Sequence, residues 1–213
     1  MPKFTETEKQ RIEAKLLEAA KERFITLGLK KTSVEELTRS AGIAQGSFYL
    51  FFNSKEELYF EIIQREEAVI RSKLNESFLA AFRAGSAEAM KHFLRESLAV
   101  MEENPLIRQM YDEDLLAALF RKLPEEKLAQ HFNQDVDFFL PLITEAQQQG
   151  WIIESNPATI VSLLRSFVLL ALQRKLIGEE QYRETMELLM SMIADGLVRN
   201  TQVRMEKGGR LDD

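Results

Sequence analysis

The sequence predicts an all-α protein, and three observations support that prediction. Along most of the 213-residue chain, apolar residues recur at spacings of three and four, the period of an amphipathic helix. Beyond residue 78 the punctuation signals are those of helices, such as Asn156-Pro157 before an apolar run. No alternating strand pattern occurs there. We therefore expect a small amino-terminal domain over residues 1–55 and a larger helical domain over residues 56–202.

Composition narrows the class of protein further. The chain is 45% hydrophobic and contains no cysteine, which excludes disulfides and thiolate chemistry. No stretch is apolar enough to cross a membrane, and the first residues, MPKFTETEK, lack the apolar core of a signal peptide, so a cytoplasmic location is expected. Net charge is −6, yet residues 1–55 hold ten Lys and Arg against seven Glu, so the basic share is concentrated at the amino terminus.

The first helix is expected to begin at Thr5 and to stop at Gly28. Thr5 and Glu8 have the spacing of a capping box, and Gly28 has the backbone freedom that ends a helix. Lys3, Lys9 and Arg11 could reach toward a nucleic-acid backbone or belong to a solvated terminus. One face is apolar and supports this domain: Ile12, Leu16, Ala19, Ala20, Phe24 and Leu27.

Two short helices separated by a tight turn follow. The first begins at Thr32 or Ser33, because each lies three residues before a glutamate, and it ends at Gly42. The second is expected over residues 44–52, and so short a connection makes the helices cross as in a helix-turn-helix. We assign Phe48 and Phe52 to the core. Small and amide side chains suit a helix that enters the major groove, and the exposed candidates are Gln45, Gly46, Ser47, Tyr49 and Leu50.

The next helix begins with a further capping box, Ser54 and Glu57. Lys55 places a cation in the first turn, where the helix dipole disfavours it. A lysine beside free backbone N–H groups could clamp a phosphate of DNA, or it could be solvated. The helix continues to about Phe78 and could transmit a tilt from the larger domain to the reading helix.

This stretch resembles the amino-terminal domain of the TetR family of bacterial transcriptional regulators. The match rests on Ser33, Val34, Ala41, Gly42, Ile43, Gly46, Ser47, Phe48, Tyr49, Phe52 and Ser54 to Leu58. The resemblance implies a three-helix helix-turn-helix domain in which Thr32, Ser33, Tyr49 and Lys55 contact phosphates. It also implies that Gln45, Gly46, Ser47 and Leu50 face bases or the groove wall. Two residues depart from the family pattern: Ala44 removes the usual serine cap, and Leu50 stands where histidine or tyrosine is common.

The larger domain is expected to hold further helices. One begins at Ser86 and ends at Asn104-Pro105; short helices follow over 106–111 and 114–123; and a longer one runs from Pro124 toward Gly150. Pro141 should kink or break that longer helix. The last two long helices are expected from Asn156-Pro157 and over 179–199. The tail 203–213 is polar and is expected to be disordered.

Residues 160–172 predict a dimer, because a helix that is apolar nearly all round must be covered on more than one side. A second copy of the last two helices is the simplest cover, and the resemblance places dimerisation there; burial in a monomer's core is the alternative. Arg165 could pair across the dimer, meet an acidic ligand or reach the surface, and pairing ranks first. The candidate interface residues are Ile160, Leu164, Phe167, Val168, Met186, Leu189, Ile193 and Leu197.

Together these features predict a ligand-responsive regulator, a repressor that binds a palindromic DNA operator as a homodimer. A small, largely apolar effector that enters the core of residues 79–175 would release the DNA by linkage. The candidate lining residues are Phe93, Met101, Met110, Tyr111, Phe132, Phe139, Trp151 and Phe167. Residues 112–114 are acidic and could neutralise a cationic ligand or cap a helix.

The alternatives are a helical-bundle enzyme and a partner-binding protein without DNA binding. A di-metal bundle needs glutamate three residues before histidine, and neither His92 nor His131 has one, so we expect no metal and no cofactor. The sequence has no glycine-rich phosphate loop and no recognisable catalytic triad. A partner-binding protein would leave the helix-turn-helix stretch without a role.

Overall fold

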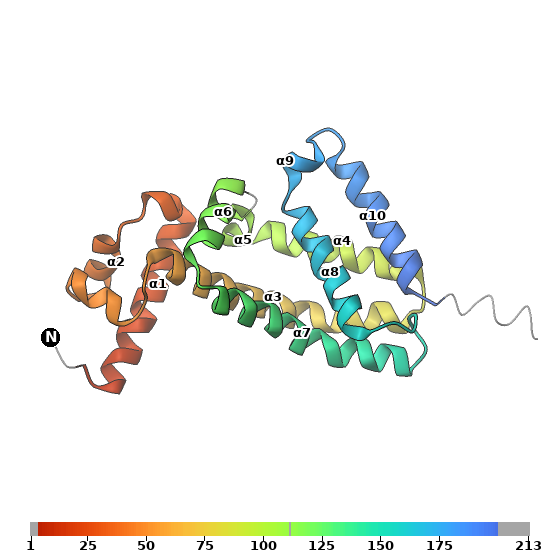
Figure 1. Cartoon of the computed structure of the whole chain (residues 1–213), viewed down its shortest axis with the longest axis horizontal. Coiled ribbons are helices and arrows are strands. Elements are labelled where there is room, and N and C mark those ends of the chain that lie inside the picture. Colours follow the sequence, from red (N-terminus) through yellow and green to blue (C-terminus); the bar gives the residue numbers. More distant parts are fainter. Residues whose placement is uncertain (1–3, 111, 200–213) are drawn as a thin grey trace, which may run out of the picture. The chain divides into compact units, whose positions relative to one another are not determined.

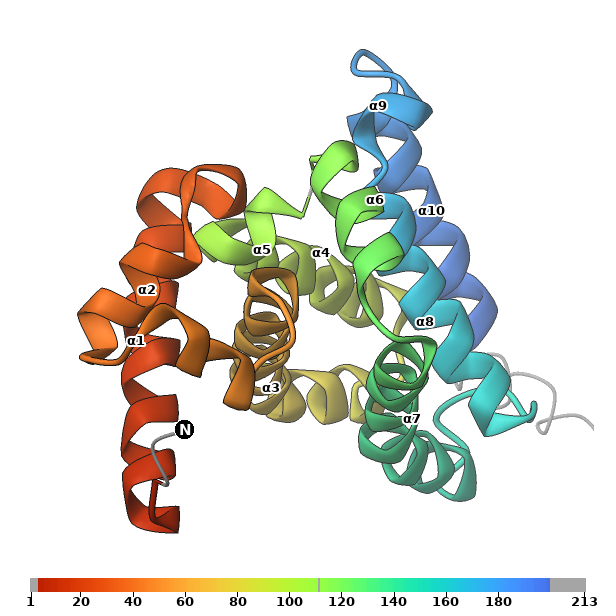
Figure 2. The same ribbon diagram turned by 60° about the vertical axis from the view of Figure 1, so that its left-hand side comes forward.

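The computed structural model describes residues 4–110 and 112–199, and it confirms the all-α prediction (Figures 1 and 2). Those residues hold no β-strand beyond an isolated bridge between Ile152 and Val198. The expected tail 203–213 lies outside the described residues. The elements in chain order are α1 Glu6–Lys31, α2 Val34–Ala41, the 3-10 helix η1 Gln45–Leu50, α3 Lys55–Arg83, α4 Ala87–Glu103, α5 Pro105–Gln109, α6 Glu113–Lys122, α7 Glu125–Gln148, α8 Pro157–Ala171, α9 Arg174–Ile177 and α10 Tyr182–Leu197.

The chain packs as two compact units. Unit 1 comprises Met1–Val69 and Asn104–Leu128, and unit 2 comprises Ile70–Glu103 and Ala129–Asp213. Unit 1 therefore contains the helix-turn-helix, the first part of α3, and also α5 and α6. The boundary expected at residue 55 was placed at the end of the sequence motif, whereas this division reflects which segments lie close together in space.

Local capping explains where the first helices begin and end. The Thr5 side chain and the Glu8 side chain bond each other's backbone N–H groups at the start of α1, as predicted. At Gly28 the backbone leaves helical geometry, with φ 78° and ψ 167°, and one short turn follows. A positive φ of this kind is strained for residues other than glycine.

Ser33, and not Thr32, caps α2. Its hydroxyl accepts from the Glu36 N–H at 3.2 Å, and the Glu36 carboxylate accepts from the Ser33 N–H at 3.0 Å. Gly42 ends the helix in the left-handed conformation, φ 74°. These contacts decide between the two starts that the sequence left open.

Unit 2 is built around an aromatic cluster. The ring of Phe78 in α3 lies 4.5 Å from Phe82, 5.1 Å from Phe93 in α4 and 5.5 Å from Phe139 in α7, measured between ring centroids. Residues of α8 and α10 complete the same core. An exposed ion pair, Arg95 with Glu187 at 2.8 Å, joins α4 to α10.

Two proline signals behave differently from each other. Asn156-Pro157 starts α8, with the Asn156 side chain accepting from the Ala158 N–H at 2.9 Å, as predicted. Pro141, in contrast, lies inside α7, which is one helix from Glu125 to Gln148, so the proline does not break it. Within the described part of the chain, no helix has the length and apolar character needed to cross a membrane.

Candidate nucleic-acid interface

The segment expected to read DNA is a short helix, as predicted; it spans Gln45–Leu50 (η1) and has 3-10 geometry. Ala44 precedes it and offers no side-chain cap, whereas the Ser47 N–H donates to the Ala44 carbonyl at 2.8 Å, one turn of the tighter 3-10 type. The missing serine cap, noted in the sequence, fits this local tightening.

The side chains of η1 divide between solvent and core. Gln45 and Gly46 are exposed, as are Tyr49 (59% exposed) and Leu50 (50%). Tyr49 and Leu50 are therefore available to contact a partner from adjacent positions of η1. Nothing lies within 4 Å of the position a Cβ would take on Gly46, so this face is sterically open.

Phe48 and Phe52 hold η1 against the rest of unit 1, as predicted. Both are buried, and their ring centroids are 6.0 Å apart. Tyr49 meets the edge of Phe48 at 5.5 Å between centroids. The exposed tyrosine is therefore positioned by a buried neighbour.

Two residues that the sequence placed among the DNA contacts face inward in the structure. Thr32 is 1% exposed, and its hydroxyl donates to the Gly28 carbonyl at 2.9 Å. Ser47 is 7% exposed. Thr32 is therefore engaged within unit 1, whereas a contact of the Ser47 hydroxyl with DNA stays a prediction. Periodicity did not reveal this, because the orientation of Thr32 depends on the break at Gly28, and that of Ser47 on the 3-10 geometry.

Ser33 is exposed, but its hydroxyl belongs to the cap of α2, where it also donates to the Glu36 carboxylate at 2.9 Å. The hydrogen bond from the Ser33 backbone N–H, together with that from its hydroxyl, holds the pKa of Glu36 below its ordinary value. The Ser33 hydroxyl is thus occupied by the cap of α2. A contact between Ser33 and a phosphate would have to leave these capping hydrogen bonds in place.

Lys55 has a role that neither sequence alternative described. Its ammonium donates to the carbonyl of Leu29 at 2.7 Å and to that of Thr32 at 2.9 Å, with Lys30 O at 3.5 Å. These carbonyls lie at the end of α1, where helical partners are missing, so a cation there is favourable. Lys55 thus ties the start of α3 to the junction between α1 and α2. The link spans more than 20 residues of sequence, which is why local reasoning missed it.

Glu57 is a buried anchor that the sequence assigned only to a cap. It is 6% exposed, pairs with Lys127 of α7, and accepts from the backbone N–H of Asn53 at 2.9 Å and from its amide at 2.8 Å. Burial acts to raise the pKa of Glu57, but the hydrogen bonds from Lys127 and Asn53 outweigh it and keep the pKa below its ordinary value. The sequence showed only the Ser54-to-Glu57 spacing of a cap, and the Glu57 N–H does donate to the Ser54 hydroxyl at 3.0 Å.

The short helix α5 is held to α1 and α3 within unit 1. The Gln109 amide donates to the Phe24 carbonyl at 2.7 Å, and the buried Tyr59 hydroxyl donates to the Leu106 carbonyl at 3.2 Å. Burial raises the pKa of Tyr59. Glu66 pairs with Lys21 and accepts from the amide of Asn104 at 2.8 Å. These polar contacts explain why α5 groups with the helix-turn-helix and not with unit 2.

The expected effector residues are only partly brought together. Phe93 and Phe167 are buried in the core of unit 2, with Phe139 and Trp151 packed against it. Met101 is partly buried, whereas Met110 belongs to unit 1. Tyr111 and the side chain of Phe132 lie outside what the structure describes. Phe78, which the sequence analysis did not single out, contacts both Phe93 and Phe139. Of the acidic residues 112–114, Asp112 caps α6 by accepting from the Asp114 and Leu115 N–H groups.

The expected interface residues on α8 and α10 lie mainly inside their own protomer. Five of the eight are at most 6% exposed: Ile160, Phe167, Met186, Ile193 and Leu197. Leu164, Val168 and Leu189 are partly buried and pack against the same core. The core of unit 2 therefore already covers the five buried residues, while the three partly buried ones keep some exposed surface. The apolar side chains left exposed on these helices are Leu163 (41%), Leu169 (39%), Leu170 (45%), Leu188 (62%) and Met192 (63%).

Comparison with known proteins decides the family. A family model described as bacterial regulatory proteins, tetR family, matches residues 16–62. The uncharacterized HTH-type transcriptional regulator YfiR of Bacillus subtilis (strain 168) is 36% identical over 168 residues, which are 79% of this chain and 80% of that protein. The chain belongs to the TetR family. The HTH-type transcriptional regulator TtgR of Pseudomonas putida is 25% identical over 93% of this chain and 84% of its own length.

Solved structures agree at the level of the fold. A TetR-family transcriptional regulator from Pectobacterium atrosepticum superposes with a TM-score of 0.66 at 22% identity, covering 92% of this chain and 99% of that one. This TetR-family chain is therefore an HTH-type transcriptional regulator with an amino-terminal helix-turn-helix domain and a helical carboxyl-terminal part.

Proposed function

We propose that this TetR-family protein is a repressor that binds a palindromic DNA operator as a homodimer and is released by a small, largely apolar effector. The observation that carries the proposal is the exposed face of η1, where Gln45, Gly46, Tyr49 and Leu50 lie together above a buried aromatic anchor. Such a regulator acts where bacterial DNA is, in the cytoplasm.

Each exposed residue of η1 suits a particular contact with DNA. The amide of Gln45 can pair with a base edge, and the open space at Gly46 lets the backbone approach the groove. Tyr49 can donate its hydroxyl to a phosphate, and Leu50 can contact a thymine methyl. Thr32 is left out because it is buried and its hydroxyl donates to the Gly28 carbonyl, and Ser47 is left out because only 7% of it is exposed. Lys55 supports the surface through the carbonyls of α1 and is not proposed as a primary phosphate ligand.

A dimer fits the exposed apolar face of α8 and α10. Leu163 and Leu170 of α8 and Leu188 and Met192 of α10 are between 41% and 63% exposed, and we propose that a second copy covers them. A two-fold axis through that patch would present two copies of η1 to the two half-sites of a palindrome.

The effector site is proposed in the aromatic core of unit 2, around Phe78, Phe93 and Phe139. One relative is named as a repressor, the probable acrEF/envCD operon repressor of Escherichia coli (strain K12), which is 23% identical over 77% of this chain and 75% of its own length. A protein of similar fold, RolR, has been solved in complex with resorcinol; its structure superposes with a TM-score of 0.61 at 14% identity, covering 97% of each chain.

Fluorescence anisotropy with labelled duplexes from the DNA upstream of the protein's own gene tests the proposal. We expect salt-dependent binding that requires a palindrome. Tyr49→Phe should weaken binding to all duplexes about equally, and Gln45→Ala should cost about 1–3 kcal/mol at particular bases. Ile25→Ala, at a surface residue of α1 that is 40% exposed, is the matched control.

Two results would count against DNA binding as the function. One is anisotropy that does not depend on sequence at any salt concentration. The other is loss of binding by the Ile25 control equal to that of the two η1 variants. Either result would favour a partner-binding helical protein instead.

A further inference from the structure

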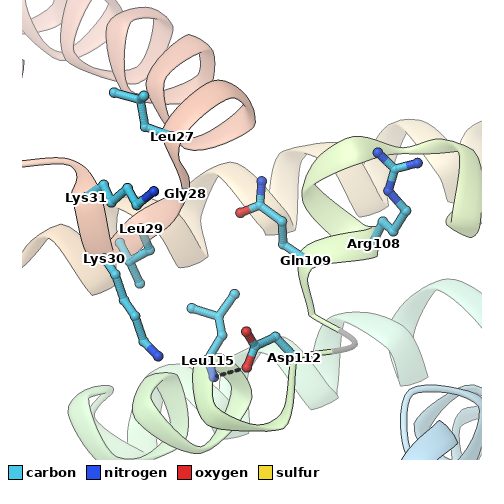
Figure 3. Close-up of a pocket in the computed structure, with 9 residues that line it drawn as sticks. All are labelled: Leu27, Gly28, Leu29, Lys30, Lys31, Arg108, Gln109, Asp112 and Leu115. Carbon is cyan, nitrogen blue, oxygen red and sulfur yellow. Dashed lines mark hydrogen bonds between the residues drawn. The ribbon is translucent and has the colours of Figure 1, made fainter.

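Unit 1 contains a pocket that is separate from the proposed effector site. It has a volume of about 370 Å³ and lies where the end of α1 meets α5 and the start of α6 (Figure 3). A volume of this size is within the range that holds small organic ligands. Its apolar wall is formed by Leu27, which is 45% exposed, and by the buried side chains of Leu29 and Leu115.

The charged residues around this pocket are mostly cations. Lys30, Lys31 and Arg108 line it, and none of them forms an ion pair with another of the residues described. By contrast, Lys21, Arg23 and other basic residues of unit 1 pair with glutamates. In Figure 3 the Lys31 ammonium points across the pocket toward Gln109, while the Arg108 guanidinium extends away from the other side chains. Lys30 and Lys31 are therefore the groups placed to meet a ligand.

The opposing negative groups are already engaged. Asp112, the acidic side chain among the lining residues, accepts from the N–H groups of Asp114 and Leu115 at 3.0 and 3.2 Å. The free carbonyls at the end of α1 would repel an anion, but the Lys55 ammonium binds those of Leu29 and Thr32. Asp112 keeps its negative charge, but three cations line the pocket against this one carboxylate, so an anion beside Lys30 and Lys31 meets a net positive field.

We propose that this pocket binds a small organic carboxylate with a short apolar body. The carboxylate would pair with the ammonium groups of Lys30 and Lys31, and the apolar body would lie against Leu27 and Leu115. Charge-assisted hydrogen bonds of this type are shorter and stronger than neutral ones. Such a ligand bridges the last turn of α1 and the first turn of α6, so it stabilises unit 1 by mass action. This site is independent of the proposed DNA and effector functions.

Isothermal titration calorimetry of the full-length protein tests the site with sodium hexanoate as the probe. We expect hexanoate to bind. Uncharged hexanamide should bind much more weakly because it lacks the negative charge, and inorganic phosphate because it lacks the apolar body. The double variant Lys30→Gln, Lys31→Gln should weaken hexanoate binding by about tenfold or more. Leu27→Ser should weaken it a few-fold, and this exposed side chain can be replaced without disturbing the core.

The matched control is Arg121→Gln, Lys122→Gln, which also removes two positive charges from an exposed part of unit 1 but does not touch the pocket. It should bind hexanoate within about twofold of the original protein, because distant surface charges are largely screened. If both double variants lose the same hexanoate affinity, the loss reflects the net charge of the protein and not the pocket, and the proposal is overturned.

Three other outcomes would overturn it. If hexanamide or phosphate binds as tightly as hexanoate, the pocket does not combine the two recognition elements. If hexanoate binding survives both the lysine variant and Leu27→Ser, the probe binds elsewhere, for example in the core of unit 2. If the lysine variant weakens DNA binding but leaves hexanoate binding unchanged, Lys30 and Lys31 serve DNA phosphates instead.

Discussion

Replacement of Leu188 and Met192 by serine should separate the proposed dimer. These side chains of α10 are 62% and 63% exposed in the single chain. Complete burial of a leucine or methionine contributes about 1.5–3 kcal/mol, so covering the exposed fraction contributes about 1–2 kcal/mol per side chain. Because a two-fold axis presents each residue twice, the double variant removes about 4–8 kcal/mol from the interface.

That free energy corresponds to a rise of at least about a thousandfold in the dissociation constant of the dimer, since each 1.4 kcal/mol is tenfold. Sedimentation equilibrium at micromolar concentrations measures it directly. The control is Ile25→Ser, Val69→Ser, at surface positions of unit 1 that are 40% and 52% exposed. The face of α8 and α10 would be refuted as the interface if both double variants dimerise as the original protein does, or if the original protein is a monomer.

Three further predictions concern unit 1. Lys55→Met should lower the free energy of unfolding in urea by about 1–3 kcal/mol, because it leaves the carbonyls of Leu29 and Thr32 without their donor; a large loss of DNA affinity at unchanged stability would instead assign Lys55 to a phosphate. Glu57→Gln should also cost about 1–3 kcal/mol at neutral pH. Because the folded-state pKa of Glu57 lies below its ordinary value of 4.5, the stability it contributes is present above that value and is lost as pH falls through the lower, folded-state pKa. Urea titrations from about pH 6 to about pH 3.5 should therefore show the difference from the variant shrinking, and a constant difference would contradict this role. Tyr59→Phe should cost about 1 kcal/mol, measured in the same titration, since it removes one buried hydrogen bond to the Leu106 carbonyl, and an unchanged midpoint would mean that the bond adds nothing.

Features set by neighbouring residues could be predicted from the sequence. The capping box of Thr5 and Glu8, the left-handed Gly42 and the start at Asn156-Pro157 each depend on only a few adjacent positions. The all-α fold follows from many such local signals together with the apolar period. The exposure of Tyr49 and Leu50 agrees with the expectation from the motif.

Features set by distant contacts could not be predicted. Lys55 meets carbonyls 23 and 26 residues away, and Glu57 pairs with Lys127, 70 residues away. The helix over 160–172 is apolar nearly all round, so its period does not say which side packs inward. Ile160 and Phe167 belong to the inward side, whereas Leu163 and Leu170 remain outside. Of the kink or break expected at Pro141, the break does not occur, because α7 is one helix from Glu125 to Gln148.

Lys55 also closes residues 29–55 into a loop, because its ammonium group donates hydrogen bonds to the Leu29 and Thr32 carbonyls. A loop closed in this way unfolds locally as one unit, because α2 and η1 cannot unfold separately while the hydrogen bonds of Lys55 remain. Their backbone amides should therefore exchange with solvent deuterium in one cooperative step. Acetylation of Lys55 would remove the ammonium charge and weaken these hydrogen bonds without a change of sequence. Local unfolding of α2 and η1 would then become more frequent.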